Sequence, residues 1–483
     1  MNRSGGSRVR STGKPARLGA SGDAAINYTK ALVWLYSLQR FGIKLGLENI
    51  RRLIAELHVD LGNARVIHVA GTNGKGSVCA MIDSICRAQK HRTGLFTSPH
   101  LVTFRERIRV NGEMISKSEV AAGLTNIRKL VADWEPHPTF FEITTALALK
   151  HFAVVTIEPT VGDMRLSQQG EALPSPSPLP SSRGEKIKVR GESKSDSNVD
   201  VVILETGLGG RLDATNAIQS DVAVITPIAL DHEQWLGNSL EKIAREKAGI
   251  IKPQTPVVSA PQLTEAEKVI RARAAECDAP LRVVDKPYEK SPIALRGQHQ
   301  KLNAALAIAA LKLDGLKPSS FQKSQIEIGD AAVARGLSTV EWPGRFQCWD
   351  KRTVIDGAHN PSAAKVLAET WREIFGDERA TMILAILSDK DLRGICEALA
   401  PIADSVLLPE IRSKRAAAPQ ELATILSSMT PSLPYSLTES IAEAFELARA
   451  KPKPILITGS LHFAGEALAH LRGEPAAFEE CAQ

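Results

Sequence analysis

Short apolar runs alternate with longer stretches of helical periodicity along most of the chain. The run Arg65–Ala70 has the composition of a buried strand, and it is followed by a glycine-rich turn and a helical pattern over Val78–Ala88. Strand, glycine turn and helix open a βα unit. Further strand-like runs follow at Val199–Leu204, Val222–Thr226, Pro256–Ser259, Thr353–Ile355, Thr381–Leu387, Ser405–Leu408 and Pro454–Thr458. Because helical patterns lie between most of them, we predict an α/β protein with mainly parallel sheets.

The pattern divides the chain into parts. Amphipathic helical spacing begins near Ile26, and the Ser/Gly-rich residues 1–25 are predicted to be a disordered basic tail. Residues 26–340 are predicted to form one α/β domain, and residues 341–483 a smaller Rossmann-like α/β domain. A polar, proline-containing stretch at about 158–198 interrupts the first domain and is interpreted as a flexible surface insertion.

Composition and charge agree with two α/β domains. The 483 residues are 43 % apolar and 24 % charged, which is ordinary for a globular protein. Residues 1–24 account for +4 of the net charge of +6, so the rest of the chain is close to neutral. We therefore expect no nucleic-acid partner, since a basic stripe is missing from the body of the sequence.

Location follows from what the sequence lacks. No apolar run approaches the roughly 20 residues that span a bilayer, and the N-terminus has no apolar stretch of signal-peptide type. The six cysteines form no CxxC pair, so we interpret them as core residues of a reducing compartment. We predict a cytoplasmic monomer with no membrane partner.

The glycine-rich turn carries the first candidate chemistry. Glycines let successive backbone N–H groups turn toward phosphate oxygens, and the following helix adds its positive N-terminus. The pattern departs from Walker A, because Gly76 separates Lys75 from Ser77. A purely structural βα turn is the alternative to a nucleotide site. The predicted nucleotide-binding residues of this turn are Gly71, Thr72, Asn73, Gly74, Lys75, Gly76 and Ser77.

Two carboxylates stand at the ends of predicted strands. Glu205 ends the run Val201–Leu204, and Asp356 follows Thr353–Ile355. Ligands of open α/β sheets bind at the carboxyl ends of the strands, so both side chains are expected in the crevice. From the residues alone, Glu205 is a candidate metal ligand, whereas an isolated His232 more often satisfies local hydrogen bonds.

In its full context, the glycine turn resembles the loop of folylpolyglutamate synthases, which are members of the Mur ligase superfamily. Further motifs continue the resemblance in family order over about residues 27–465. They are His68–Ser77, Thr97–Leu101, Glu106–Ile108, Leu204–Asn216, Leu230–His232, Glu246–Ile250, Trp342–Arg345, Asp356–Pro361 and Gly459–Leu461.

The resemblance implies that residues 26–340 form a P-loop-containing, ATP-binding, Mur-ligase-like domain and that residues 341–483 form a glutamate-ligase domain. It also implies a set of site residues. ATP would also contact Asn303, Arg345 and Asp356, and Mg²⁺ would be held by Ser98, Glu205 and His232. Lys75 would neutralise phosphate charge. Lys247 matches a lysine that is carbamylated in the family, and His359 lies near the same site.

The resemblance also implies the substrates and the reaction. ATP would phosphorylate the carboxylate of dihydropteroate or a reduced folate, and L-glutamate would then attack the acyl phosphate. Three segments would bind the pterin, with aromatic side chains that can stack on a flat ring. They comprise Leu45, Gly46, Leu47, Glu48, Thr139, Phe140, Phe141, Glu142, Arg211, Leu212 and Asp213.

Each of these residues also has a structural interpretation. Phe140 and Phe141 could be ordinary core, and Asp213 could stabilise its own turn. Two other functions stay open at this point: a Mur-type peptidoglycan ligase, and a non-catalytic ATP-binding protein. The preferred hypothesis is a bifunctional dihydrofolate synthase/folylpolyglutamate synthase.

Overall fold

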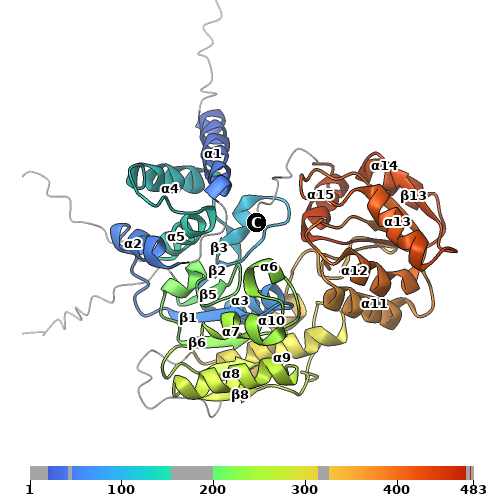
Figure 1. The fold of residues 1–483 in the computed structure, drawn as a ribbon. Coiled ribbons are helices and arrows are strands. Elements are labelled where there is room, and N and C mark those ends of the chain that lie inside the picture. Colours follow the sequence, from blue (N-terminus) through green and yellow to red (C-terminus); the bar gives the residue numbers. More distant parts are fainter. Residues whose placement is uncertain (1–19, 42–45, 154–198, 314–325, 475–478, 480–483) are drawn as a thin grey trace, which may run out of the picture.

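The computed structural model places two sheets side by side, with helices on the faces of each (Figure 1). It describes residues 20–41, 46–153, 199–313, 326–474 and 479. The predicted insertion at 158–198 and residues 1–19 of the predicted tail lie outside the described residues. Helix α1 (Ala20–Ser37) begins six residues before Ile26, the position near which the sequence predicted order to start.

The first sheet is eight-stranded within the described residues, in the order β4-β3-β2-β5-β1-β6-β7-β8. All neighbours are parallel except the edge strands β3 and β4. The bounds are β1 (Arg65–Ala70), β2 (Thr93–Phe96), β3 (Ile108–Val110), β4 (Glu113–Met114), β5 (Val201–Glu205), β6 (Val222–Ile225), β7 (Val257–Ser259) and β8 (Leu281–Val283). Strand β1 lies between β5 and β6, and Val69 is in register with Glu205. The glycine turn after β1 therefore begins beside the Glu205 side chain.

Alternate residues of the central strands face two different helix layers. Val66 packs with the layer of α1, α2 (Glu48–Glu56), α4 (Lys117–Leu130) and α5 (Phe140–Phe152). Ile67 packs with the layer of α3 (Lys75–Ala88), α9 (Gln298–Lys312) and α10 (Asp330–Thr339). Helices α7 (Leu240–Ala248) and α8 (Thr264–Glu276) cover β6 and β7. Burial on both faces explains the nearly continuous apolar runs that predicted these strands.

The second sheet is six-stranded in the described part of the chain, in the order β13-β12-β11-β14-β10-β9. Only β9 runs antiparallel to its neighbour among these strands. The bounds are β9 (Gln347–Cys348), β10 (Thr353–Ile355), β11 (Ala380–Leu384), β12 (Ala403–Pro409), β13 (Tyr435–Thr438) and β14 (Ile455–Thr458). One face carries α11 (Pro361–Phe375), α12 (Leu392–Leu399) and α13 (Pro419–Met429), and the other carries α14 (Ile441–Arg449) and α15 (Leu461–Leu471).

Besides the linker at 340–346, the described residues join the domains at several places, and one of them is the loop after β2. Leu101 of the first domain joins the hydrophobic cluster under α15, where a Cβ on Gly465 would lie 1.9 Å from the Leu101 carbonyl oxygen. Beyond α15, Glu479 returns to the first domain and accepts hydrogen bonds from the Phe104 N–H (2.6 Å) and the Thr103 hydroxyl (3.1 Å). The loop after β2 is thus packed against the second domain. None of the described helices has the length and apolarity needed to cross a bilayer.

Candidate active site between the two domains

A cavity lies between the domains at the carboxyl ends of β1, β5 and β6. It brings together all of the residues predicted from the sequence to bind nucleotide or metal or to act in catalysis. They are Gly71, Thr72, Asn73, Gly74, Lys75, Gly76, Ser77, Ser98, Glu205, His232, Lys247, Asn303, Arg345, Asp356 and His359. These residues come from both domains, so the cavity is formed only where the two domains are in contact.

The glycine turn has the geometry of a phosphate-binding loop. Gly71 has a φ of 148°, and a Cβ there would lie 1.8 Å from the Thr226 hydroxyl, so only glycine fits. The Thr72 and Asn73 N–H groups donate to the Pro227 carbonyl at 3.0 and 3.2 Å and anchor the loop to the segment after β6. Helix α3 then begins at Lys75. Since the first N–H groups of a helix lack intrahelical acceptors, this end of α3 presents N–H donors suited to an anion.

Gly76 is explained by a residue to which sequence reasoning assigned no role. A Cβ on Gly76 would lie 2.7 Å from Nε1 of Trp342, which stands in the interdomain linker. The indole therefore packs directly on the phosphate loop, and the departure from Walker A makes room for it. The motif Trp342–Arg345 was visible in the sequence, but its contact partner was not.

Helix α9 packs on the other side of the loop. Asn303 is buried, and its Nδ2 donates to Oε1 of Gln300 at 2.9 Å. Gln300 in turn lies 3.4 Å from the Ser77 hydroxyl, and Asn303 Oδ1 would lie 2.8 Å from a Cβ on Gly74. The polar face of α9 thus fixes the loop at both its turn and its helix start.

Lys247 is buried beneath the phosphate loop. Its Nζ donates to the Gly71 carbonyl at 2.8 Å. Burial, together with the nearby charge of Lys75, lowers the pKa of Lys247 to about 7. A substantial fraction of this amine is therefore neutral at physiological pH.

The site offers donors that fit a magnesium ion. The Glu205 carboxylate is buried, and it accepts a hydrogen bond from the Ser98 N–H at 3.1 Å. Burial raises the pKa of Glu205, against the charge of Lys75. The Ser98 hydroxyl is buried and lacks a hydrogen-bond partner in the part of the chain that the structure describes. A carboxylate and an unsatisfied hydroxyl oxygen are hard ligands of the kind Mg²⁺ prefers.

His232 completes the predicted metal set less directly. It lines the same cavity, and burial lowers its pKa to about 4, so the imidazole is neutral and able to ligate. Within the described residues, no three His, Cys, Asp or Glu side chains gather closely enough to hold a metal alone. The protein side chains therefore leave positions for water or phosphate oxygens, as is usual for Mg²⁺.

The second domain presents Arg345 and Asp356 to the cavity. Asp356 accepts hydrogen bonds from the Phe346 N–H at 2.7 Å and the Ala358 N–H at 2.8 Å. Burial raises the pKa of Asp356, and the charge of Arg345 opposes that rise. His359 Nδ1 donates a hydrogen bond to the Gly357 carbonyl at 2.9 Å. The two charged groups thus lie where a nucleotide on the loop of the first domain would face them.

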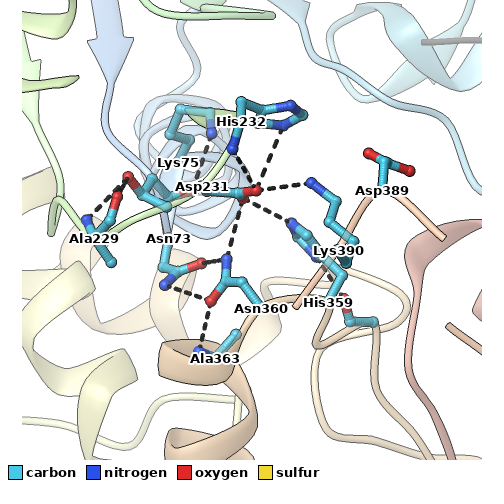
Figure 2. A network of polar contacts seen from close by, with 12 residues as sticks. Asn73, Lys75, Ala229, Asp231, His232, His359, Asn360, Ala363, Asp389 and Lys390 are labelled. Carbon is cyan, nitrogen blue, oxygen red and sulfur yellow. Dashed lines mark hydrogen bonds and ion pairs between the residues drawn. The ribbon is translucent and has the colours of Figure 1, made fainter. Parts of the chain in front are cut away.

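Asp231 is the second site residue that sequence reasoning missed. Figure 2 shows its carboxylate at the centre of a polar network that crosses the domain boundary. It accepts from Nζ of Lys390 at 2.7 Å and from Nδ2 of Asn360 at 3.2 Å, and His359 Nε2 lies 3.6 Å away. The Leu230–His232 motif was recognised, but its partners in the second domain lie far away in the sequence.

The predicted pterin-binding residues lie outside the lining of this cavity. Thr139 and Glu142 form a capping box at the start of α5, with the Thr139 hydroxyl and Glu142 Oε2 2.9 Å apart. Phe140 stacks on Tyr36 with ring centroids 5.7 Å apart. Phe141 packs against Gly207, where a Cβ would lie 2.5 Å from its ring. These four side chains therefore make structural contacts within the first domain.

The other pterin segments are also engaged locally. Asp213 is buried and accepts from the N–H groups of Gly207 and Leu208, each at 2.9 Å. Arg211 pairs with Glu246 at 2.9 Å. The cavity lining also lacks the other described residues of these segments, which are Gly46, Leu47, Glu48 and Leu212. Leu45 lies outside the described residues. Asp213 nevertheless shapes the cavity wall, because Gly207 and Leu208 are part of it.

Fold and site together define a class of protein: a two-domain nucleotide-binding α/β protein with a Mur-ligase architecture. A family model described as the Mur ligase, glutamate ligase domain matches residues 344–461. The chain is 32 % identical to the dihydrofolate synthase/folylpolyglutamate synthase of Bacillus subtilis, over 92 % of this chain and 99 % of that protein.

Solved structures of folylpolyglutamate synthases have the same fold as this chain. The Mycobacterium tuberculosis folylpolyglutamate synthase complexed with ADP and AMPPCP superposes with a TM-score of 0.74 at 30 % identity, covering 92 % of this chain and 99 % of that one. E. coli FolC in complex with DHPP and ADP gives a TM-score of 0.72 at 31 % identity, covering 92 % of this chain and 98 % of that one. The chain belongs to the dihydrofolate synthase/folylpolyglutamate synthase family.

Proposed function

We propose that this protein ligates L-glutamate to dihydropteroate and to reduced folates at the expense of ATP. The observation that carries the proposal is the convergence of Lys75, Glu205 and Arg345 from two domains on one cavity at the phosphate loop. A carboxylate and a triphosphate repel each other, and the cations and hard ligands gathered here offset that repulsion. The match over nearly the whole length of a relative favours this reaction over the two alternatives left open by the sequence.

The proposal gives each residue a task. The start of α3 and Lys75 would bind the phosphates, and Arg345 would approach them from the second domain. Ser98, Glu205 and His232 would hold Mg²⁺, which would shield the charge of the transferring phosphoryl group. The γ-phosphoryl group passes to the substrate carboxylate, the amine of glutamate attacks the acyl phosphate, and phosphate leaves.

Lys247 fits the carbamylation that the resemblance implies. Carbon dioxide adds only to a neutral amine, and a pKa of about 7 keeps part of the Lys247 population neutral near physiological pH. The carbamate would place a negative charge next to the Gly71 carbonyl and near the metal ligands. Intact-protein mass after mild handling would show the added carbon dioxide.

The cellular setting is also part of the proposal. We infer a cytoplasmic monomer, with domain limits near residue 341. The buried thiols of Cys79, Cys86, Cys277 and Cys396 are free, which is typical of a reducing compartment.

The deciding experiment is ADP release with MgATP and L-glutamate, with dihydropteroate and tetrahydrofolate offered separately. Glutamate-dependent turnover with both substrates supports the bifunctional activity. Turnover with one alone assigns the protein to that step. Absence of glutamate-dependent ADP with either, in protein that binds MgATP, would contradict the proposal.

A further inference from the structure

Four polar side chains meet across the domain boundary at the edge of the cavity (Figure 2). Asp231 and Asn73 belong to the first domain, and Lys390 and Asn360 belong to the second. Besides the contacts of Asp231, the two asparagines pair reciprocally: Asn360 Nδ2 donates to Asn73 Oδ1 at 3.1 Å, and Asn73 Nδ2 to Asn360 Oδ1 at 3.4 Å. Asn360 therefore contacts both the phosphate loop and Asp231.

The charged pair within this cluster is buried. The side chains of Asp231 and Lys390 are each 7 % exposed, and their atoms approach to 2.7 Å. Removing one partner of such a pair would leave the other charge buried and uncompensated, whereas both charges are hydrated if the domains separate. The pair therefore favours the closed arrangement only while both members are present.

Both donors are rigidly mounted on the second domain. Asn360 caps α11, because its Oδ1 accepts the Ala363 N–H at 2.8 Å. Lys390 follows Asp389, which pairs with Arg415 through two contacts of 2.9 Å. These contacts hold the backbone around both donors in place relative to the second domain.

Asp231 is equally tied to the phosphate loop. The Ala229 N–H donates to the Thr72 hydroxyl at 3.0 Å, and that hydroxyl donates back to the Ala229 carbonyl at 3.0 Å. The Asp231 carboxylate also accepts the His232 N–H at 2.9 Å. The Asp231 carboxylate thus joins the segment of His232 to the second domain, and Ala229 ties the same segment to the phosphate loop.

We propose that Asp231 is a positioning residue whose pair with Lys390 latches the second domain over the phosphate loop. The latch holds Arg345 and Asp356 in reach of a bound nucleotide. This role rests on the proposed ligase function, because closure matters only if both domains contribute to turnover. Asp231 itself acts through the groups that it orients and has no contact with the transferred phosphoryl group in this scheme.

The test compares Asp231→Asn, Lys390→Met and the double variant with Asp330→Asn. The last is a matched control, because Asp330 pairs with Lys312 at the same 2.7 Å but is 82 % exposed and lies within one domain. Loss of the latch lowers the closed fraction, so the KM values for both ATP and glutamate should rise on the order of tenfold or more, with a smaller change in kcat. The double variant should be no worse than either single one, and the control should match the wild type.

Small-angle scattering provides a readout that does not depend on turnover. Without nucleotide, Asp231→Asn and Lys390→Met should show a larger radius of gyration than the wild type and the control, and AMPPNP should restore compactness. Equal radii in all proteins would overturn the latch. Losses confined to Lys390→Met, or to the KM for glutamate, would overturn the role of Asp231 and assign Lys390 to substrate binding. A wild type without ligase activity would refute the proposed function, and the scattering would still decide the latch.

Discussion

Replacing Gly76 with alanine tests how the linker and the phosphate loop fit together. The added Cβ would lie 2.7 Å from Nε1 of Trp342 and 3.1 Å from two further indole atoms. Two effects compete. Alanine stabilises a helix by up to about 1 kcal/mol relative to glycine, whereas overpacking costs about 1–3 kcal/mol.

The steric term should dominate in the wild-type background. Trp342 is half-buried against the core under α3, and the Arg109 guanidinium lies 5.8 Å from its ring centre. The indole therefore cannot move freely, and we expect a net loss of about 1–2 kcal/mol in the free energy of unfolding. The phosphate loop would shift with it, so the KM for ATP should rise.

The assay is urea unfolding and ATP-dependent kinetics in two backgrounds. Trp342→Leu removes all three contacting atoms, so in that background Gly76→Ala should become neutral or slightly stabilising through helix propensity. An equal loss in both backgrounds would show that the indole is not the cause. A stabilised single variant would show that the indole yields at little cost, and the reasoning about a fixed linker would be refuted.

Three other changes probe the site and the domain contact. Burial lowers the pKa of Lys247 to about 7, so this lysine loses its proton at a lower pH in the folded state than in the unfolded chain. The buried charge therefore destabilises the folded state fully below pH 7, and this destabilisation is relieved as the pH rises from 7 toward 10.5. Lys247→Met should therefore raise the melting temperature at pH 6 by more than at pH 9, as calorimetry without CO₂ would measure; the reverse trend would contradict the assigned cause. Burial raises the pKa of Glu205, so Glu205→Gln should stabilise the ligand-free protein at pH 8. The same variant should lose the increase in melting temperature that MgATP gives over ATP with EDTA. A retained magnesium-dependent increase would exclude Glu205 as a ligand. Glu479→Ala removes the acceptor of the 2.6 Å hydrogen bond from the Phe104 N–H and should cost about 1–3 kcal/mol in urea unfolding, whereas an unchanged midpoint would show that this contact contributes nothing.

Most of the central strands could be predicted because they are buried on both faces, although the four-residue β2 (Thr93–Phe96) was not predicted. Runs such as Val222–Thr226 and Pro454–Thr458 are apolar except for their final threonine, and each overlaps a strand, β6 and β14. The strands β4, β8, β9 and β13 are sheet edges or two to four residues long, and partial exposure mixes polar residues into them. Their sequences therefore lack the signal that identified the centre of each sheet.

The site residues also fall into two groups, those that local sequence could place and those that it could not. Glu205 and Asp356 could be placed because a parallel sheet delivers the end of each strand to one edge, a rule that needs only the local sequence. Asp231, Trp342 and Lys390 act through contacts between domains, and a contact between residues more than a hundred positions apart leaves no periodicity to detect. The motifs around Asp231 and Trp342 could be recognised in the sequence, but no role could be given to these two residues. Their roles depend on contacts that form only when the two domains and the linker pack around the phosphate loop.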